Sequence, residues 1–130
     1  SDMQCALGIS QLKKLNKFII KRRKIASYYD SFFKNFDFCK TPFVQNSIYH
    51  SYHLYPLQIN FSKLKFNKSM LFERMKRNNI ILQVHYHPIH KFKFYTKLLK
   101  TSKQYLENSE NFYKNEISMP VYPTLNVSNE

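Results

Sequence analysis

Tyr52-His53-Leu54-Tyr55-Pro56-Leu57-Gln58-Ile59-Asn60-Phe61 is an apolar run that is rich in residues favouring β-structure. We predict a strand here. Since Pro56 cannot donate a ladder hydrogen bond, we expect this strand to lie at a sheet edge or to break at Pro56. Further along the chain, the spacing of apolar residues predicts a helix from Lys68 to Asn78 and a second strand from Ile80 to Tyr86. A helix between two strands is a compact alternating unit, but the order alone leaves open whether the strands run parallel.

The amino-terminal part of the chain has a helical pattern. Apolar residues recur every three or four positions from Asp2 to about Phe33, which predicts one long helix or two helices in tandem along an apolar surface. Gly8 is the only glycine, and a glycine inside a helix costs about 1 kcal/mol relative to alanine. We therefore expect another backbone to approach Gly8 closely. The stretch from Asp37 to Ser51 is typical of a connecting loop.

The carboxyl-terminal part predicts a short helix from Asn108 to Asn115, capped by Asn108, and a short strand from Ile117 to Val121. Ser128 is typical of the cap of a further helix, so the end of the chain resembles a truncated domain. These elements predict an α+β fold, in which a long N-terminal helix is followed by a small mixed or antiparallel sheet packed with helices. We divide the chain into a linking helical segment, residues 1–36, and a small α/β domain, residues 37–130.

Composition sets limits on the class of protein. A chain of 130 residues has the size of one domain, and no apolar run approaches the roughly 20 residues that cross a bilayer. We predict a cytoplasmic protein that binds no membrane, because no secretory leader is recognisable and two cysteines do not make a disulfide scaffold. Lys, Asn, Phe, Tyr and Ile account for 61 of the 130 residues, a bias that A- and T-rich codons produce.

The net charge of +13 raises the alternative of a basic nucleic-acid-binding module. The lysines are spread through every segment instead of gathering on one face beside stacking aromatics, so we predict no nucleic-acid partner. The compact cluster from Lys21 to Lys24 lies within the helical pattern, which favours a solvated helix face. Steeply salt-dependent binding to nucleic acid would favour the alternative.

The run His85-Tyr86-His87-Pro88-Ile89-His90 is the densest group of functional side chains. In a strand, His85 and His87 would share one face and Tyr86 the other. We predict no metal site, because zinc needs three or four ligands and only His50 and His53 supply further imidazoles. Imidazole and phenol groups at a strand end are suited to binding a polar substrate, whereas the alternative is a set of surface histidines with ordinary hydrogen bonds.

No self-sufficient catalytic apparatus is recognisable. There is no Gly-x-Ser-x-Gly elbow, neither cysteine has a neighbouring histidine, and a single glycine excludes phosphate-binding glycine loops. We therefore predict no catalytic residue, no cofactor-binding residue and no metal ligand within the chain.

Five blocks in order along nearly the whole chain carry a family resemblance. The blocks are Ser1–Leu12, Arg22–Tyr29, Ser51–Pro56, Asn79–His90 and Asn115–Pro123. In this order they resemble the DegT family of sugar aminotransferases. The Val-His-Tyr-x-Pro-Ile-His version of the fourth block is similar to the branch of that family that acts in pseudaminic acid synthesis.

The resemblance implies the C-terminal domain of a fold type I aminotransferase that uses pyridoxal 5'-phosphate. It implies transfer of an amino group from glutamate to C4 of a UDP-4-keto-6-deoxy-N-acetylhexosamine, in a homodimer whose cofactor lysine lies in a large domain upstream. None of the 17 lysines here lies in that Schiff-base motif, so the chain alone is expected to be inactive. His85, Tyr86 and His90 are the predicted substrate-binding residues. Asn79 stands where the family usually has glycine and is the next best residue for positive φ.

Overall fold

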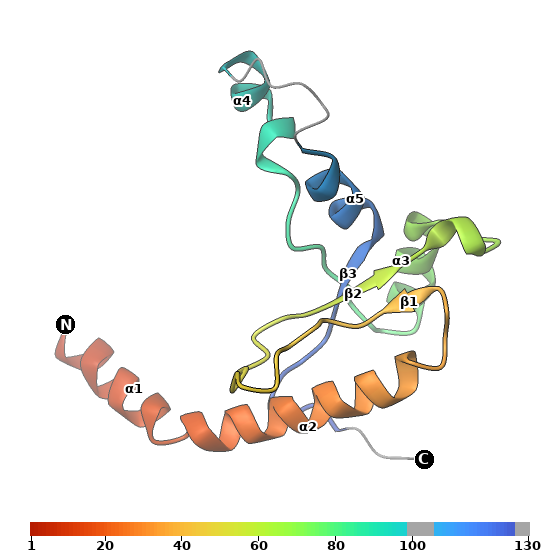
Figure 1. Cartoon of the computed structure of the whole chain (residues 1–130). Coiled ribbons are helices and arrows are strands. Elements are labelled where there is room, and N and C mark those ends of the chain that lie inside the picture. Colours follow the sequence, from red (N-terminus) through yellow and green to blue (C-terminus); the bar gives the residue numbers. More distant parts are fainter. Residues whose placement is uncertain (99–105, 127–130) are drawn as a thin grey trace.

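The computed structural model describes residues 1–98 and 106–126. The described part combines α-helices with a small three-stranded antiparallel sheet, which confirms the predicted α+β fold (Figure 1). The expected cap at Ser128 lies outside the described residues. The α-helices are α1 (Asp2–Leu12), α2 (Leu15–Phe33), α3 (Lys68–Arg77), α4 (Lys93–Leu98) and α5 (Glu107–Asn115). The strands are β1 (Cys39–Lys40), β2 (Tyr55–Ile59) and β3 (Glu116–Met119), and two 3₁₀ turns are η1 (Phe61–Lys63) and η2 (Ile89–Lys91).

The sheet has the order β1-β2-β3, so the predicted strand at the centre of the sequence is the middle strand. The prediction that it lies at an edge is wrong. Pro56 is tolerated because it pairs only with Ser118 of β3, whereas β1 pairs further along, with Gln58 and Ile59. The two-residue strand β1 falls in the stretch that the sequence indicated as a loop.

The predicted strand from Ile80 to Tyr86 does not form. This segment makes one isolated antiparallel bridge, in which Gln83 and Ser118 exchange backbone hydrogen bonds of 3.4 and 2.8 Å. The next ladder bond would run from the N–H of His85 to the backbone carbonyl of Glu116. That N–H instead donates to the side-chain carboxylate of Glu116, at 3.1 Å, so the ladder ends there.

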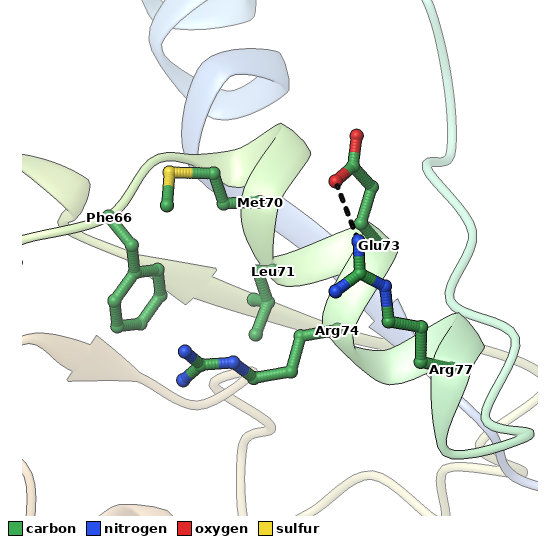
Figure 2. A pocket seen from close by; sticks show the side chains of 6 residues that line it. All are labelled: Phe66, Met70, Leu71, Glu73, Arg74 and Arg77. Atoms are coloured by element: carbon green, nitrogen blue, oxygen red, sulfur yellow. Dashed lines mark ion pairs between the residues drawn. The ribbon is translucent and has the colours of Figure 1, made fainter.

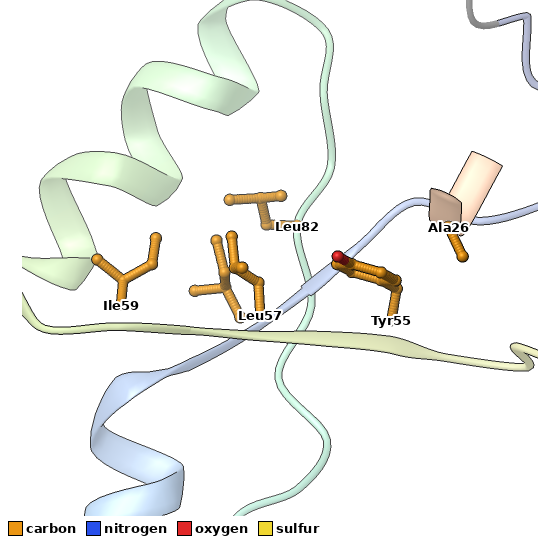
Figure 3. Close-up of a cluster of buried hydrophobic side chains, with 6 residues drawn as sticks. Ala26, Tyr55, Leu57, Ile59 and Leu82 are labelled. Atoms are coloured by element: carbon orange, nitrogen blue, oxygen red, sulfur yellow. The ribbon is translucent and has the colours of Figure 1, made fainter. Parts of the chain in front are cut away.

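The hydrophobic core lies where α2, the sheet and the extended segment after α3 meet (Figure 3). Alternate residues of β2 point to this core, as the period of two in a strand requires. The helices α2 and α3 add half-buried apolar side chains, among them Tyr29 and Leu71. The buried members of the cluster are Ala26, Tyr55, Leu57, Ile59, Leu82 and Ile117.

Two tyrosines connect α2 to the sheet. The buried Tyr55 of β2 donates its hydroxyl to Asp30 at 2.6 Å, and Tyr29 donates to the carbonyl of Pro120 at 2.8 Å. The two rings meet edge to face at 5.1 Å. Burial, followed by the hydrogen bond to Asp30, raises the pKa of Tyr55 far above its ordinary value, so this hydroxyl stays a donor throughout the neutral range.

The amino-terminal helical pattern forms two helices in tandem, of which α2 runs along one side of the sheet and α1 extends beyond it (Figure 1). None of the α1 residues is buried. A Cβ placed on Gly8 would meet nothing within 4 Å, so the expected close approach of a second backbone is absent from the described residues. None of the helices in residues 1–98 and 106–126 combines the length and apolar character that crossing a membrane requires.

The predicted helix from Lys68 is confirmed in α3, and its ends follow simple backbone chemistry. The side chain of Asn67 accepts a hydrogen bond from the N–H of Met70 at 2.9 Å, which caps the first turn. Asn79 has φ 59°, as predicted for its left-handed stop. The later helix, α5, begins at Glu107 after Leu106, so the predicted cap at Asn108 is wrong.

Replacing Asn79 with alanine is expected to lower the free energy of unfolding by about 1 kcal/mol, because asparagine adopts positive φ at a lower cost than alanine does. Replacement with glycine removes the same side chain without that cost, and we expect its stability to equal or exceed the original. Urea denaturation followed by circular dichroism measures both variants. Equal losses for alanine and glycine would show that the side chain, and not the backbone, stabilises this turn.

Candidate functional site

A pocket of about 350 Å³ lies at one end of the sheet, and we call it the His85 pocket. Because β2 and β3 are antiparallel and Tyr55 pairs with Met119, the residues before β2 and those after β3 meet at the same end. The extended segment after α3 closes the third side. Polar groups come from His53, Gln83, His85, Ser118 and Tyr122, set among the apolar Leu54, Ile81, Met119, Pro120 and Val121.

His85 is held in this pocket by a hydrogen-bonded chain of side chains. Its Nδ1 lies 2.7 Å from the hydroxyl oxygen of Ser118, and that hydroxyl donates to Oε1 of Glu116. The backbone N–H of His85 donates to Oε2 of the same carboxylate. Glu116 is 0% exposed and Ser118 is 5% exposed. We call this set the Glu116–Ser118–His85 network.

Lys68 supplies positive charge near the buried carboxylate. Its ammonium group donates to the carbonyl of Tyr113 at 2.7 Å and lies 5.0 Å from the centre of the Tyr113 ring. Burial lowers the pKa of Lys68, and the negative charge of Glu116 opposes that shift. The amine is thus occupied by Tyr113 and does not line the His85 pocket.

Tyr86, the second predicted substrate-binding residue, lies outside the pocket. Its side chain is 72% exposed, and its ring meets the imidazole of His85 edge to face at 4.6 Å. The structure therefore places Tyr86 beside His85 on the solvent side, with no hydrogen bond among the described residues to fix its hydroxyl.

His90, the third predicted residue, belongs to a different cluster. Its Nε2 lies 3.1 Å from Oε1 of Glu110, and Lys91 donates to Oε2 of Glu110 at 2.8 Å. The hydrogen bond from Lys91, followed by that from His90, holds the pKa of the Glu110 carboxyl below its usual value. His90 does not line the His85 pocket, so His85 is the one predicted residue that the described structure places in it.

The side chain of His87 packs between two aromatic rings. Its ring meets Phe92 and Tyr113 edge to face, at 5.2 and 5.0 Å between ring centres. His85 and His87 therefore have different surroundings, because the predicted strand that would place them on one face does not form and only the isolated bridge at Gln83 is present.

Sequence reasoning missed Glu116 and Ser118, and it considered His53 only as a possible metal ligand. A partial signal was present, since Ser118 lies in the strand predicted from Ile117 to Val121. Glu116 precedes that predicted strand by one residue, and it shares a face with Ser118 because β3 begins at Glu116. Within residues 1–98 and 106–126, no three His, Cys, Asp or Glu side chains come together in a way that would hold a metal ion.

A second pocket, of about 250 Å³, lies against α3 and shares no residue with the His85 pocket (Figure 2). Among the described residues, the one ion pair in this pocket joins a guanidinium nitrogen of Arg77 to Oε2 of Glu73 at 4.0 Å, and both side chains are largely exposed. Such a surface pair contributes about 0.5 kcal/mol or less. The lining residues are Phe66, Met70, Leu71, Glu73, Arg74 and Arg77, and none of them is a predicted site residue.

The basic cluster from Lys21 to Lys24 is only partly a solvated face. Lys21 and Lys24 are exposed, as expected. Arg23 is half-buried, donates to the carbonyl of His50 at 3.0 Å and lies 4.3 Å from the ring centre of Tyr49. For Arg23 the expectation of a solvated side chain is wrong, because this guanidinium fastens α2 to the loop before β2.

Comparison with solved structures identifies the class of protein. A structure of Helicobacter pylori PseC, an aminotransferase involved in the biosynthesis of pseudoaminic acid, superimposes with a TM-score of 0.83. The match has 35% sequence identity and covers 95% of this chain and 33% of that one. The fold is thus that of a sugar aminotransferase segment.

A sequence profile described as the DegT/DnrJ/EryC1/StrS aminotransferase family matches residues 1–129. The chain belongs to this family, which confirms the resemblance predicted from the five sequence blocks.

Curated relatives agree with this assignment. The UDP-4-amino-4,6-dideoxy-N-acetyl-beta-L-altrosamine transaminase of Campylobacter jejuni is 42% identical over 127 residues, which cover 98% of this chain and 33% of the relative. An uncharacterized protein of Methanocaldococcus jannaschii is 38% identical over 125 residues, covering 96% and 32%. The chain spans about a third of the length of these relatives.

Proposed function

We propose that this chain is the C-terminal segment of a pyridoxal 5'-phosphate-dependent aminotransferase of amino-sugar biosynthesis. The complete enzyme transfers an amino group from glutamate to C4 of a UDP-4-keto-6-deoxy-N-acetylhexosamine, in the biosynthesis of pseudaminic acid or a related sugar. The observation that carries the proposal is the family match over residues 1–129. The names of the C. jejuni and H. pylori proteins support the choice of sugar.

The His85 pocket is our candidate for the part of the sugar site that this chain supplies. Imidazole, amide and phenol groups in an apolar wall suit a ligand with many hydroxyls. Each polar group of the pocket lies among apolar side chains, so leaving it without a hydrogen-bond partner costs free energy that a hydroxyl of the ligand restores. Within the proposal, Tyr86 borders the sugar from the exposed side. His90 stays a weaker candidate, because Glu110 already occupies its Nε2.

The described residues do not fit the cofactor by themselves. A Schiff base needs a lysine in the pocket, and none of the described lysines lines the His85 pocket. Lys68, whose pKa burial lowers, is held by Tyr113 instead. We therefore assign no catalytic step to this chain. We propose that the Schiff-base lysine belongs to the large domain and that the chain alone is inactive.

The chain has two regions in the proposed enzyme. Residues 1–36 link the small domain, residues 37–130, to the large domain, and the exposed helix α1 is the part of this link that the described core leaves uncovered. The complete enzyme is a cytoplasmic homodimer that binds a UDP-sugar and glutamate.

A chimaera tests the proposed function. The matching third of the C. jejuni transaminase is replaced by this chain, and formation of the 4-amino sugar nucleotide from its 4-keto precursor and glutamate is followed by mass spectrometry. We expect an active enzyme. His85→Ala in the chimaera is expected to lower kcat/KM for the sugar nucleotide by about 10- to 100-fold, because one hydrogen bond in an enclosed site is lost.

His87→Ala is the matched control, since this imidazole lies two positions away and outside the His85 pocket. It should leave kcat/KM within about threefold of the parent chimaera. The chain on its own, mixed with pyridoxal 5'-phosphate, should develop no aldimine absorbance that depends on one particular lysine. A folded but inactive chimaera, or an aldimine band that one lysine substitution in the isolated chain abolishes, would contradict the proposal.

A further inference from the structure

The Glu116–Ser118–His85 network fixes the position of a proton. The Ser118 hydroxyl has one hydrogen, which it donates to Oε1 of Glu116. Its oxygen can then only accept from the ring of His85, whose Nδ1 lies 2.7 Å away. Nδ1 of His85 therefore carries a hydrogen, and in the neutral ring Nε2 has a free lone pair.

Glu116 directs this arrangement because both of its oxygens accept. Oε1 accepts from Ser118 and Oε2 accepts from the backbone N–H of His85, so the carboxylate holds the backbone and the ring of the same residue. The carboxylate is fully buried, and Lys68 is the positive group that acts on it from α3. The buried carboxylate with its two donors favours one arrangement of the His85 backbone and ring, because breaking either hydrogen bond leaves a buried polar group without a partner.

The other ring nitrogen of His85, Nε2, is available for a ligand of the His85 pocket. His85 lines the His85 pocket, and no described residue forms a hydrogen bond with its Nε2. We propose that Glu116 and Ser118 are positioning residues that hold His85 in the Nδ1–H tautomer, so that Nε2 accepts a hydrogen bond from a hydroxyl of a sugar bound in the pocket. The ligand half of this proposal rests on the proposed function, whereas the tautomer half stands on this chain alone.

Two other histidines have the opposite tautomer and serve as internal controls. Nδ1 of His50 accepts from the backbone N–H of Tyr52 at 3.1 Å, so its hydrogen must be on Nε2 when the ring is neutral. Nε2 of His90 faces the carboxylate of Glu110, which can only accept. His85 is thus set apart from both by its hydrogen-bond partners.

Nuclear magnetic resonance of the ¹⁵N-labelled 130-residue chain reads these tautomers directly, from the shifts of the two ring nitrogens near pH 8, where an ordinary imidazole is neutral. His85→Gln assigns the signals. We expect an Nδ1–H pattern for His85 and Nε2–H patterns for His50 and His90. An Nε2–H pattern for His85 in the unmodified chain would overturn the proposal.

Substitutions of Ser118 then test the cause. In Ser118→Ala the His85 pattern should shift toward Nε2–H while the His50 pattern stays the same. Ser118→Thr retains the hydroxyl and should restore the Nδ1–H pattern. An unchanged His85 pattern in a folded Ser118→Ala chain would show that Ser118 does not position the ring.

Kinetics of the chimaera test the ligand half. Ser118→Ala should raise KM for the sugar nucleotide by about tenfold and leave KM for glutamate and kcat within about threefold, with Ser118→Thr restoring the sugar KM. An inactive chimaera beside the expected tautomers would refute the proposed function and leave the network intact. An active chimaera in which Ser118→Ala leaves the sugar KM unchanged would refute the ligand half alone.

Discussion

Leu57→Ala is expected to lower the free energy of unfolding by about 2–5 kcal/mol. Leu57 is 0% exposed in the middle of β2, and its side chain lies between those of Tyr55 and Ile59 in the core cluster (Figure 3). Its partner across the sheet is the buried Ile117 of β3. Truncation loses the transfer free energy of the removed atoms and leaves a cavity that the sheet and α3 cannot close. Urea denaturation followed by circular dichroism gives the change in midpoint and slope.

Leu12→Ala is the matched control, because it is the same chemical change at an exposed position of α1. Its effect should stay within about 0.5 kcal/mol. Leu57→Met, which nearly conserves volume, should cost less than about 1.5 kcal/mol. A loss below about 1 kcal/mol for Leu57→Ala would mean that the cluster around β2 is not tightly packed in solution.

Glu116→Ala is expected to lower the free energy of unfolding by about 2–4 kcal/mol. The substitution leaves the Ser118 hydroxyl and the N–H of His85 without the acceptor that both use, in a region where Glu116 is fully buried. It also removes the negative charge that acts on Lys68. Thermal and urea unfolding of the variant measure the loss.

Glu107→Ala provides the control for the loss of a carboxylate, because Glu107 is exposed at the start of α5. Its effect should be about 0.5 kcal/mol, from the interaction with the amino-terminal end of the helix. Glu116→Gln keeps one accepting oxygen and should fall between the two. If Glu116→Ala proved as stable as Glu107→Ala, water would have to satisfy both donors, and the network would not position His85.

Local patterns predicted those elements whose sequence carries its own periodicity. The helices from Asp2 and from Lys68 and the strand around Leu57 follow from the spacing of apolar residues. The strand β1 has only two residues, which are too few to show an alternation of polar and apolar side chains. It forms because β2 pairs with it through Gln58 and Ile59. The segment from Ile80 to Tyr86 has strand composition, yet a side-chain acceptor on Glu116 ends its ladder.

The candidate site was predictable only in part, because contacts between distant segments of the chain determine most of it. His85 was identified because its side chain is chemically distinctive and because the block around it resembles a family motif. Its neighbours in the pocket depend on the register of Tyr55 against Met119, which no local pattern states. His90 lies close to His85 in sequence, but the turn η2 carries it to Glu110 and away from the pocket.

The order of the strands along the chain has a consequence for synthesis on the ribosome. The middle strand β2 is made early, whereas its partner β3, with the buried Ile117, follows only after α3, η2, α4 and α5. Until then the nascent chain exposes an open edge of β2 and a core without its last layer, and closing so long a loop costs entropy. We therefore expect the sheet to be completed only after Glu116–Met119 have emerged.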